Sequence, residues 1–309
     1  MRTKPVRETL PWLIGGVLFV ALLLGLLLHF RQETNPSQQL AAQASRVDLV
    51  ARMQIGLTSA SEAEKSAVLA ITDQDSQTFA DQARAATAGV ERDFLEFGAL
   101  PAAEGAGKEK ELLAQFSETF HNLKAIDENV LTLAVKNTNL KAYALLFGDA
   151  ANTLAQLDAA LSRVIAKHAD TPDAKRVMVM AFGARLGVLR VQALLAPHIA
   201  EESDKKMDEM EISISAEEAQ VRKAFDGLGG LQDDVDLRTA TSQFSRYEEV
   251  KTRILALSRE NTNVRSLALS LNQKRNSLAL CLDALSALKA AILEEPIAGV
   301  TYNRPAKPR

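Results

Sequence analysis

Four polar residues lie at positions that the surrounding helical pattern reserves for apolar side chains. Glu64 interrupts one apolar row and His198 a second, while Asn137 and Asn261 hold equivalent places in two more. A carboxylate, an imidazole and two carboxamides offer charge and hydrogen bonds to a small polar solute, so the four are candidate ligand-binding residues. The alternative is structural, because a buried asparagine fixes helix register at a cost in stability, and Glu64 can pair with His198.

The four residues are expected to lie in one layer. Counted from the nearest predicted turn, near residue 102 or residue 230, their depths along the helices agree within about 10 Å at 1.5 Å per residue. Pro197 removes one helical hydrogen bond beside His198, which favours a kink and looser packing there. The sequence therefore predicts a single polar layer of Glu64, Asn137, His198 and Asn261.

Other kinds of chemistry find little support. The chain has one cysteine and four scattered histidines, so neither an internal disulfide nor a cysteine-based zinc site is expected. It contains no phosphate-binding loop, no HExxH and no GxSxG, and we predict neither an enzyme nor a cofactor or metal. Without residues 1–10 and 296–309 the body holds 30 basic and 38 acidic side chains, which argues against nucleic-acid binding.

Long helices must position these residues. Gly and Pro together number 24 of 309 residues, too few for the turns of an all-β fold. Breaks at 98–105, 168–172 and 227–230 divide the body into four helical segments. Apolar residues recur every seven positions in the second segment, from Leu112 to Leu161 with Thr119 as the one polar exception, and in the fourth, from Val250 to Ile292. This repeat predicts an all-α, elongated antiparallel four-helix bundle.

The body also contains an internal repeat. The stretch LTLAVKNTNLKAYAL at 131–145 matches LALSRENTNVRSLAL at 255–269 at 7 of 15 positions, with an offset of 124 residues. We therefore predict that the bundle consists of two duplicated helical hairpins.

A membrane helix is expected near the N-terminus. Residues 11–30 contain no Asp, Glu, Lys or Arg and would span about 30 Å as a helix, the thickness of a bilayer core. The basic residues 1–10 would remain in the cytoplasm, and the rest of the chain would be exported. A cleaved signal peptide is the alternative, although its small-residue site at 42–44 lies far from the apolar run. No second apolar stretch of membrane-spanning length lacks charged residues, so we predict that the chain crosses a bacterial inner membrane once.

The last helix carries a family resemblance. Its stretch NTNVRSLA at 261–268 punctuates an apolar heptad with Asn and Ala, and in this respect residues 1–295 resemble the periplasmic four-helix-bundle sensor domain of methyl-accepting chemotaxis proteins. The resemblance implies a homodimer that binds a small solute or a periplasmic partner protein. It also implies ligand contacts across the dimer interface for Arg84 and Arg92, for which a solvated helix face is the alternative.

The family's second membrane span, linker and signalling domain have no counterpart after residue 295, where a basic flexible tail, 296–309, is expected. We therefore predict that a periplasmic sensor-like domain, 31–295, signals through a partner. The alternative is a structural coiled-coil tether or adaptor that binds no ligand.

Overall fold

The computed structural model describes residues 36–100, 107–231 and 233–297. The predicted membrane segment 11–30, the basic residues 1–10 and most of the tail 296–309 lie outside these residues. Every regular element within the described ranges is helical, which confirms the all-α bundle. The helices are α2 (Pro36–Leu69), α3 (Asp73–Ala99), α4 (Gly107–Ala134), α5 (Thr138–Leu145), α6 (Ala151–Lys167), α7 (Ala174–Ala200), α8 (Asp204–Gly227), α9 (Val235–Glu260), α10 (Thr262–Leu269) and α11 (Arg275–Glu294). Short π-helices, η1 (Leu146–Ala150) and η3 (Ser270–Lys274), join α5 to α6 and α10 to α11, and a 3-10 turn, η2 (Gly229–Leu231), precedes α9.

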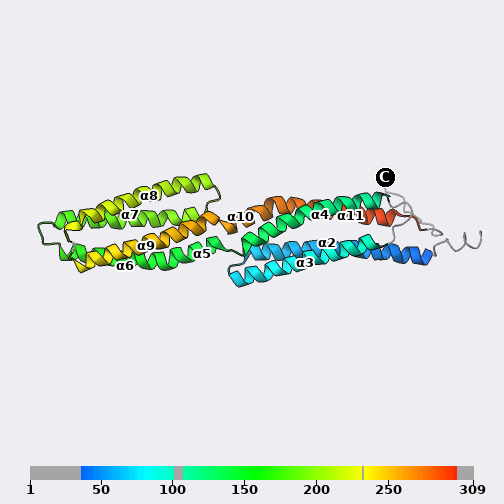
Figure 1. Cartoon of the computed structure of the whole chain (residues 1–309), viewed down its shortest axis with the longest axis horizontal. Helices are drawn as coiled ribbons and strands as arrows, with labels where there is room; N and C mark the ends of the chain where they lie inside the picture. Colours follow the sequence, from blue (N-terminus) through cyan, green and yellow to red (C-terminus); the bar gives the residue numbers. More distant parts are fainter. Residues whose placement is uncertain (1–35, 101–106, 232, 298–309) are drawn as a thin grey trace, which may run out of the picture.

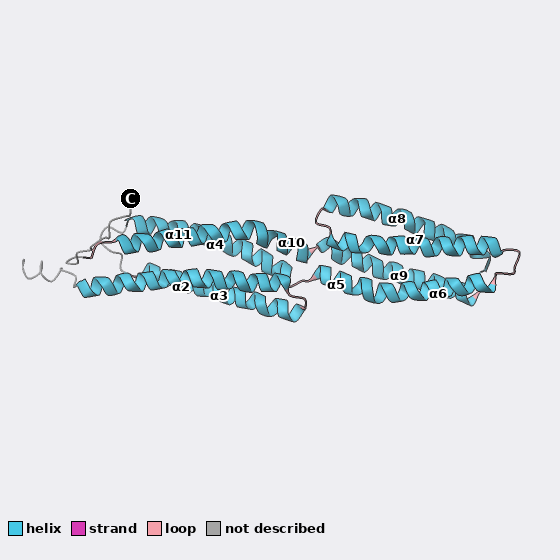
Figure 2. Ribbon diagram, turned by 180° about the vertical axis from the view of Figure 1, so that it is seen from behind, coloured by secondary structure: helices cyan, strands magenta, loops and turns pink. Residues whose placement is uncertain are grey.

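The helices form two four-helix bundles joined end to end into a rod (Figures 1 and 2). The proximal bundle contains α2, α3, α4 and α11, and the distal bundle contains α6, α7, α8 and α9. The runs α4–α5–η1–α6 and α9–α10–η3–α11 pass through both bundles. The chain enters the distal bundle through the first run and returns to the proximal bundle through the second. Both ends of the described chain lie at the proximal end, where the Gln43 side chain donates a 2.5 Å hydrogen bond to the carbonyl of Ile292.

The first and third predicted segments do not run the length of the rod. The first folds back between α2 and α3, where Thr72 accepts a 3.0 Å hydrogen bond from the backbone of Asp75. The third folds back between α7 and α8, where Ser203 caps α8 by accepting from Lys206. Each segment is therefore a hairpin of two shorter helices. The predicted single bundle of four long helices is, as a result, two stacked bundles of shorter ones.

The duplication is visible in the packing of these hairpins. Gly56 on α2 lies so close to Val90 on α3 that a Cβ atom would come within 2.6 Å of the valine Cγ2. Gly187 on α7 lies against Val221 on α8 in the same way, at 2.5 Å. Both pairs are related by an offset of 131 residues. A side chain at either glycine would push the two helices apart, so each hairpin depends on its glycine.

Each bundle is filled by its own apolar core. Leu123, Leu285 and Phe116 are among the buried residues of the proximal core, and Leu157, Val188 and Tyr247 belong to the distal one. Two helical runs, α7 and Val235–Glu294, are long and apolar enough to cross a membrane by length and composition alone. Helix α7 lines the distal core, and the run Val235–Glu294 lines the distal core through α9 and the proximal core through α11. Core helices of bundles commonly have this composition.

Candidate functional site

The two bundles meet at a break shared by the two long helical runs. Asn137 precedes α5 and Asn261 precedes α10, and both adopt the left-handed conformation with φ of 51°. Asparagine tolerates this conformation better than most residues because its short polar side chain can hydrogen-bond locally. We call residues 137–139 and 261–263 the junction.

Reciprocal hydrogen bonds join the two halves of the junction. The backbone N–H of Thr138 donates to Oγ1 of Thr262 at 3.2 Å, and the N–H of Thr262 donates to Oγ1 of Thr138 at 3.1 Å. The N–H groups of Asn139 and Asn263 donate in the same reciprocal way to each other's side-chain oxygen, both at 3.2 Å. The NTN repeat thus builds a pseudo-two-fold contact in which each copy satisfies the helix start of the other.

The asparagine side chains extend this contact toward the hairpins. Asn137 donates to Asp73 at the start of α3 at 3.1 Å and accepts from Asn263 at 2.9 Å. Asn261 accepts from Asn139 at 2.7 Å and donates to the carbonyl of Glu201 at 2.6 Å. Both predicted asparagines are therefore buried, as expected, and their polar groups are used within the chain.

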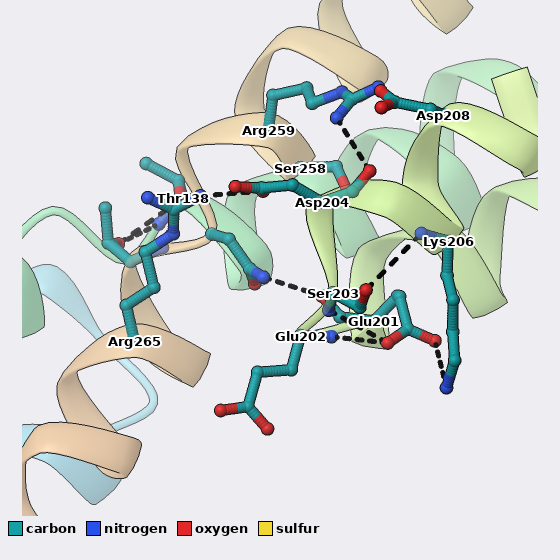
Figure 3. Close-up of polar contacts among 12 residues, drawn as sticks. Thr138, Glu201, Glu202, Ser203, Asp204, Lys206, Asp208, Ser258, Arg259 and Arg265 are labelled. Atoms are coloured by element: carbon teal, nitrogen blue, oxygen red, sulfur yellow. Dashed lines mark hydrogen bonds and ion pairs between the residues drawn. The ribbon is translucent and has the colours of Figure 1, made fainter.

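The distal hairpin is held at the C-terminal end of α7. The last carbonyls of a helix have no partner within it. Here the carbonyl of His198 accepts from Ser258 at 3.0 Å, that of Ile199 from Asn139 at 2.6 Å, and that of Glu201 from Asn261. We call these three bonds the α7 clamp. In Figure 3, Glu201, Ser203 and Asp204 of the α7–α8 turn lie beside Ser258 and Thr138 from the two long runs.

His198 lies directly at this clamp. Its side chain is fully buried, with Nδ1 at 2.8 Å from Oγ of Ser258 and Nε2 at 3.1 Å from Oε1 of Glu211. Glu211 also accepts a 2.6 Å hydrogen bond from Arg259, which lowers the pKa of Glu211. Burial lowers the pKa of His198, and the attraction of Glu211 only partly opposes this effect.

Glu64 lies in the proximal bundle and has a different partner. Its Oε2 is 2.5 Å from Nζ of Lys274, and the same ammonium group is 3.0 Å from Oδ1 of Asp127. Glu64 and Lys274 are almost completely buried, and Oε1 of Glu64 has no hydrogen-bond partner. Burial raises the pKa of Asp127 although Lys274 attracts its charge. One cation therefore serves two buried carboxylates, and we call these three residues the ion cluster.

The predicted single layer is thus divided. The asparagines lie at the junction, whereas Glu64 and His198 lie in different bundles because the first and third segments fold back. Glu64 pairs with Lys274 and not with His198. After the break at Asn261 and the π-helix η3, Lys274 is buried in the last long run and Arg275 is exposed.

The two arginines implied by the resemblance lie on α3. Arg84 forms a two-pronged ion pair with Glu128 on α4, at 3.0 and 2.9 Å, which raises the pKa of the arginine. Arg92 is exposed. A ligand role for either residue stays a prediction.

Two open grooves lie away from the predicted residues. One, of about 690 Å³, runs between the end of α8 and the start of α9, and the other, of about 430 Å³, lies between α2 and the end of α3. Glu64, Asn137, His198 and Asn261 line neither of them. Within the described ranges, no group of His, Cys, Asp and Glu side chains is arranged to hold a metal ion.

Part of the chain matches a known protein family. Residues 55–173, which run from the middle of α2 to the start of α7, match the model of the family described as a four helix bundle sensory module for signal transduction. No curated protein matches the chain. Among solved structures, the TorS sensor domain, from its crystal structure in complex with TorT in the presence of TMAO, aligns with 83% of this chain and 100% of that chain, at 10% identity and a TM-score of 0.36. The match over residues 55–173 confirms the resemblance expected from the sequence: this part of the chain has the pattern of the four-helix-bundle sensory modules.

Proposed function

We propose that the chain is a membrane-anchored periplasmic sensory domain that binds a small solute or a protein partner, works as a homodimer and passes its signal to a partner protein. The observation that carries this proposal is the match of residues 55–173 to sensory modules for signal transduction. The family is defined by signalling and not by catalysis, which agrees with the absence of catalytic motifs from the sequence.

The direction of the signal follows from the course of the chain. The predicted anchor at 11–30 precedes α2 directly, so it would attach the proximal end of the rod to the membrane. The distal bundle would then lie farther from the membrane, where a solute or partner has access. Any change in the distal bundle would reach the membrane through the junction, because among the helices that the structure describes only the runs α4–α6 and α9–α11 pass through both bundles.

Solute contact by Glu64, Asn137, His198 and Asn261 is part of the proposal. Their polar groups are bonded to neighbours within the chain or buried, so a solute would have to replace these bonds. Arg84 and Arg92 are secondary candidates, since both are accessible on α3.

One observation favours a second function, a structural tether without a ligand. Neither groove touches the predicted residues, and the asparagines already have partners within the chain, as register-setting side chains would. A tether would keep the rod rigid, whereas a sensor needs an element whose equilibrium a ligand can change.

A thermal-shift screen of the full chain in detergent separates the two functions. A solute at about 100 times its Kd stabilises the folded state by about 2.7 kcal/mol, which raises the melting temperature. For a solute that binds at the predicted residues, the Glu64→Ala and His198→Ala variants should lose the shift, while Arg163→Ala, an exposed control on α6, should keep it. If no solute in a broad library changes the melting temperature, solute sensing is contradicted and the tether is favoured.

A further inference from the structure

The outer face of α7 carries a continuous row of exposed apolar side chains. Val179, Phe182, Leu186 and Leu189 follow one another at spacings of three and four residues, with Met178 beside them, and all five are 46–56% exposed. Single exposed apolar residues are common on protein surfaces, but a contiguous row of this kind marks an interaction site. We call these five residues the α7 row.

The row is additional to the face that α7 buries. Val177, Ala181, Ala184, Val188 and Leu195 all point into the distal core. The helix is therefore apolar on two faces, with a mean hydropathy of 1.5 over its most apolar stretch. A helix that is apolar on both sides is normally covered on both sides.

The duplicated helix α2 provides an internal control. The same offset of 131 residues that relates the two hairpins places Asp48, Ala51, Ile55 and Thr58 at the positions of the four row residues. On α2 this outer face is mixed, because Asp48 and Thr58 are polar while Ala51, Ile55 and Val47, the counterpart of Met178, are apolar. The buried faces of both helices are mostly apolar. The fold itself does not require an apolar outer face, so the α7 row has another cause.

We propose that the α7 row is the face through which two copies of this chain associate, with the α7 helices packed in parallel. Both described ends of the chain lie at the proximal end of the rod, and the segment 11–30 continues from there. Two copies anchored in one membrane would therefore stand side by side in the same direction. The proposal rests on the anchored, dimeric sensor proposed above and assigns its interface.

The row has the spacing that such a contact requires. Alternating steps of three and four form the seam of a two-stranded coiled coil, and in a parallel pair each row residue meets its own copy across the two-fold axis. Gly183 is exposed next to Phe182, and no side chain there would hinder a close approach.

The charges beside the row permit this contact. Arg185 pairs with Asp158 at 2.5 Å and Arg190 pairs with Glu217 at 3.3 Å, both within one chain. The arginines on the two copies are therefore compensated before they approach one another. The row is short compared with a stable interface, which buries about 800 Å² on each partner, so the dimer should depend on the high local concentration that the membrane anchors provide.

Cysteine cross-linking of the full chain in membranes tests the proposal. Leu186→Cys is the probe, and Ile55→Cys is its matched control, because Ile55 is the equivalent position on α2 and is 66% exposed. The native Cys281 is buried, and the unmodified chain gives the background. On oxidation with copper phenanthroline, L186C should form a disulfide-linked dimer at least tenfold faster than I55C, since facing residues of a parallel seam lie within the span of a disulfide.

A second pair, Leu189→Cys and Thr58→Cys, repeats the comparison one turn along the helix. Circular dichroism of the reduced variants shows that each is folded. Efficient cross-linking of I55C without L186C would overturn the interface and leave a dimeric sensor in place. Equal rates for the two positions, or no cross-linking of either, would also overturn the proposed contact, and the latter would leave the α7 row for a different protein.

Discussion

The two sides of the junction share one backbone and differ in what they bury. On the distal side the long run α4–α6 buries Ala142, Leu146 and Ala150. At an offset of 124 residues, the proximal side buries Ser266, Ser270 and Lys274 in their place. Leu195 of α7 corresponds in the same way, by 131 residues, to Glu64 of α2. Asp127, the third member of the cluster, corresponds to Lys251, which is buried in the distal bundle and pairs with Glu218. The distal bundle thus has apolar side chains in place of Glu64 and Lys274, so the three-residue ion cluster is not a requirement of the architecture.

The two hairpins are also attached differently. The α7–α8 hairpin is joined to the junction by the three bonds of the α7 clamp. At the end of α2, the carbonyl of Ala67 accepts a hydrogen bond from Ser76 of its own hairpin instead. The bond from Asn137 of the junction goes to the side chain of Asp73 at the start of α3. The distal hairpin thus has more hydrogen bonds to the long helical runs than the proximal hairpin, and the ion cluster lies beside the proximal one. We therefore expect the proximal side of the junction to change conformation more easily than the distal side when a signal passes between the bundles.

Removing the cation of the ion cluster should have the largest effect. Lys274→Ala leaves Glu64 and Asp127 buried without compensation, which typically costs about 3–5 kcal/mol. Urea denaturation of the full chain in detergent, followed by circular dichroism, measures the loss. Arg84→Ala, which breaks a more exposed pair, should cost about 1 kcal/mol or less.

The reverse substitution sharpens the same comparison. Glu64→Leu combined with Asp127→Asn and Lys274→Met removes all three charges of the ion cluster. It places apolar side chains at the two positions where the distal bundle has Leu195 and Ala150. Replacement of a buried ion group by apolar residues is often neutral or stabilising by about 1–4 kcal/mol. If the triple variant has a free energy of unfolding as low as that of Lys274→Ala, the uncharged side chains do not stabilise this core as well as the ion cluster does.

Substitution of the two left-handed asparagines by glycine should cause the next largest loss of stability. Glycine keeps the backbone conformation, so Asn137→Gly and Asn261→Gly report mainly the loss of side-chain hydrogen bonds. Asn261→Gly leaves the carbonyl of Glu201 without this donor and should cost about 1–3 kcal/mol. Asn137→Gly gives up a bond to the more exposed Asp73 and should cost less. Equal losses would contradict the idea that the distal hairpin is held more tightly.

Hydrogen exchange locates the effect of these variants. Amides at the start of α8 should exchange faster in Asn261→Gly, because the α7–α8 turn loses one of its attachments. The amides at the start of α3 should change little in the same variant, which serves as its own control.

The helices and their buried faces could be predicted from the sequence, while the folding back could not. Val50, Met53 and Leu57 are buried on the face of α2 that holds Glu64, and Val188 and Leu195 on the face of α7 that holds His198, which agrees with the apolar rows that these two polar residues interrupt. Ile71 lies beyond the end of α2 and is exposed. A signal for this end was present: Thr72 before Asp73 and Ser203 before Asp204 are typical helix N-caps. The apolar pattern continues across both turns and hides them.

The candidate site was predicted in part for a similar reason. The burial of Asn137 and Asn261 follows from the repeat, and the structure confirms it. Lys274 was missed because a strict heptad cannot anticipate the left-handed break or η3, each of which rotates the following residues about the helix axis. Ser258 and Glu211 were missed because they approach His198 from other helices, and such contacts leave no periodic signal along one helix.

The end of the proximal bundle that lies away from the junction should respond to rising pH. Glu109 is buried beside Arg46 and close to Glu295, and burial raises its pKa to about 7 from the ordinary 4.5. The folded chain then holds this proton more tightly than the unfolded chain, so stability should fall as the pH rises from about 4.5 to 7. The melting temperature measured between pH 4.5 and 8 should show this decline, and Glu109→Gln should remove part of it.

The distal bundle should respond in the opposite direction, with a smaller effect. Burial lowers the pKa of His198 below the ordinary 6.5, so the folded chain resists protonation, and stability should fall as the pH drops below about 6.5. Nuclear magnetic resonance of labelled histidine reports the titration directly. Glu211→Gln should lower the pKa of His198 further, because it removes the charge that favours the imidazolium ion. A pKa above 6.5 in the unmodified chain would mean that the carboxylate outweighs burial, and the two bundles would then no longer differ in how their buried groups respond to acid.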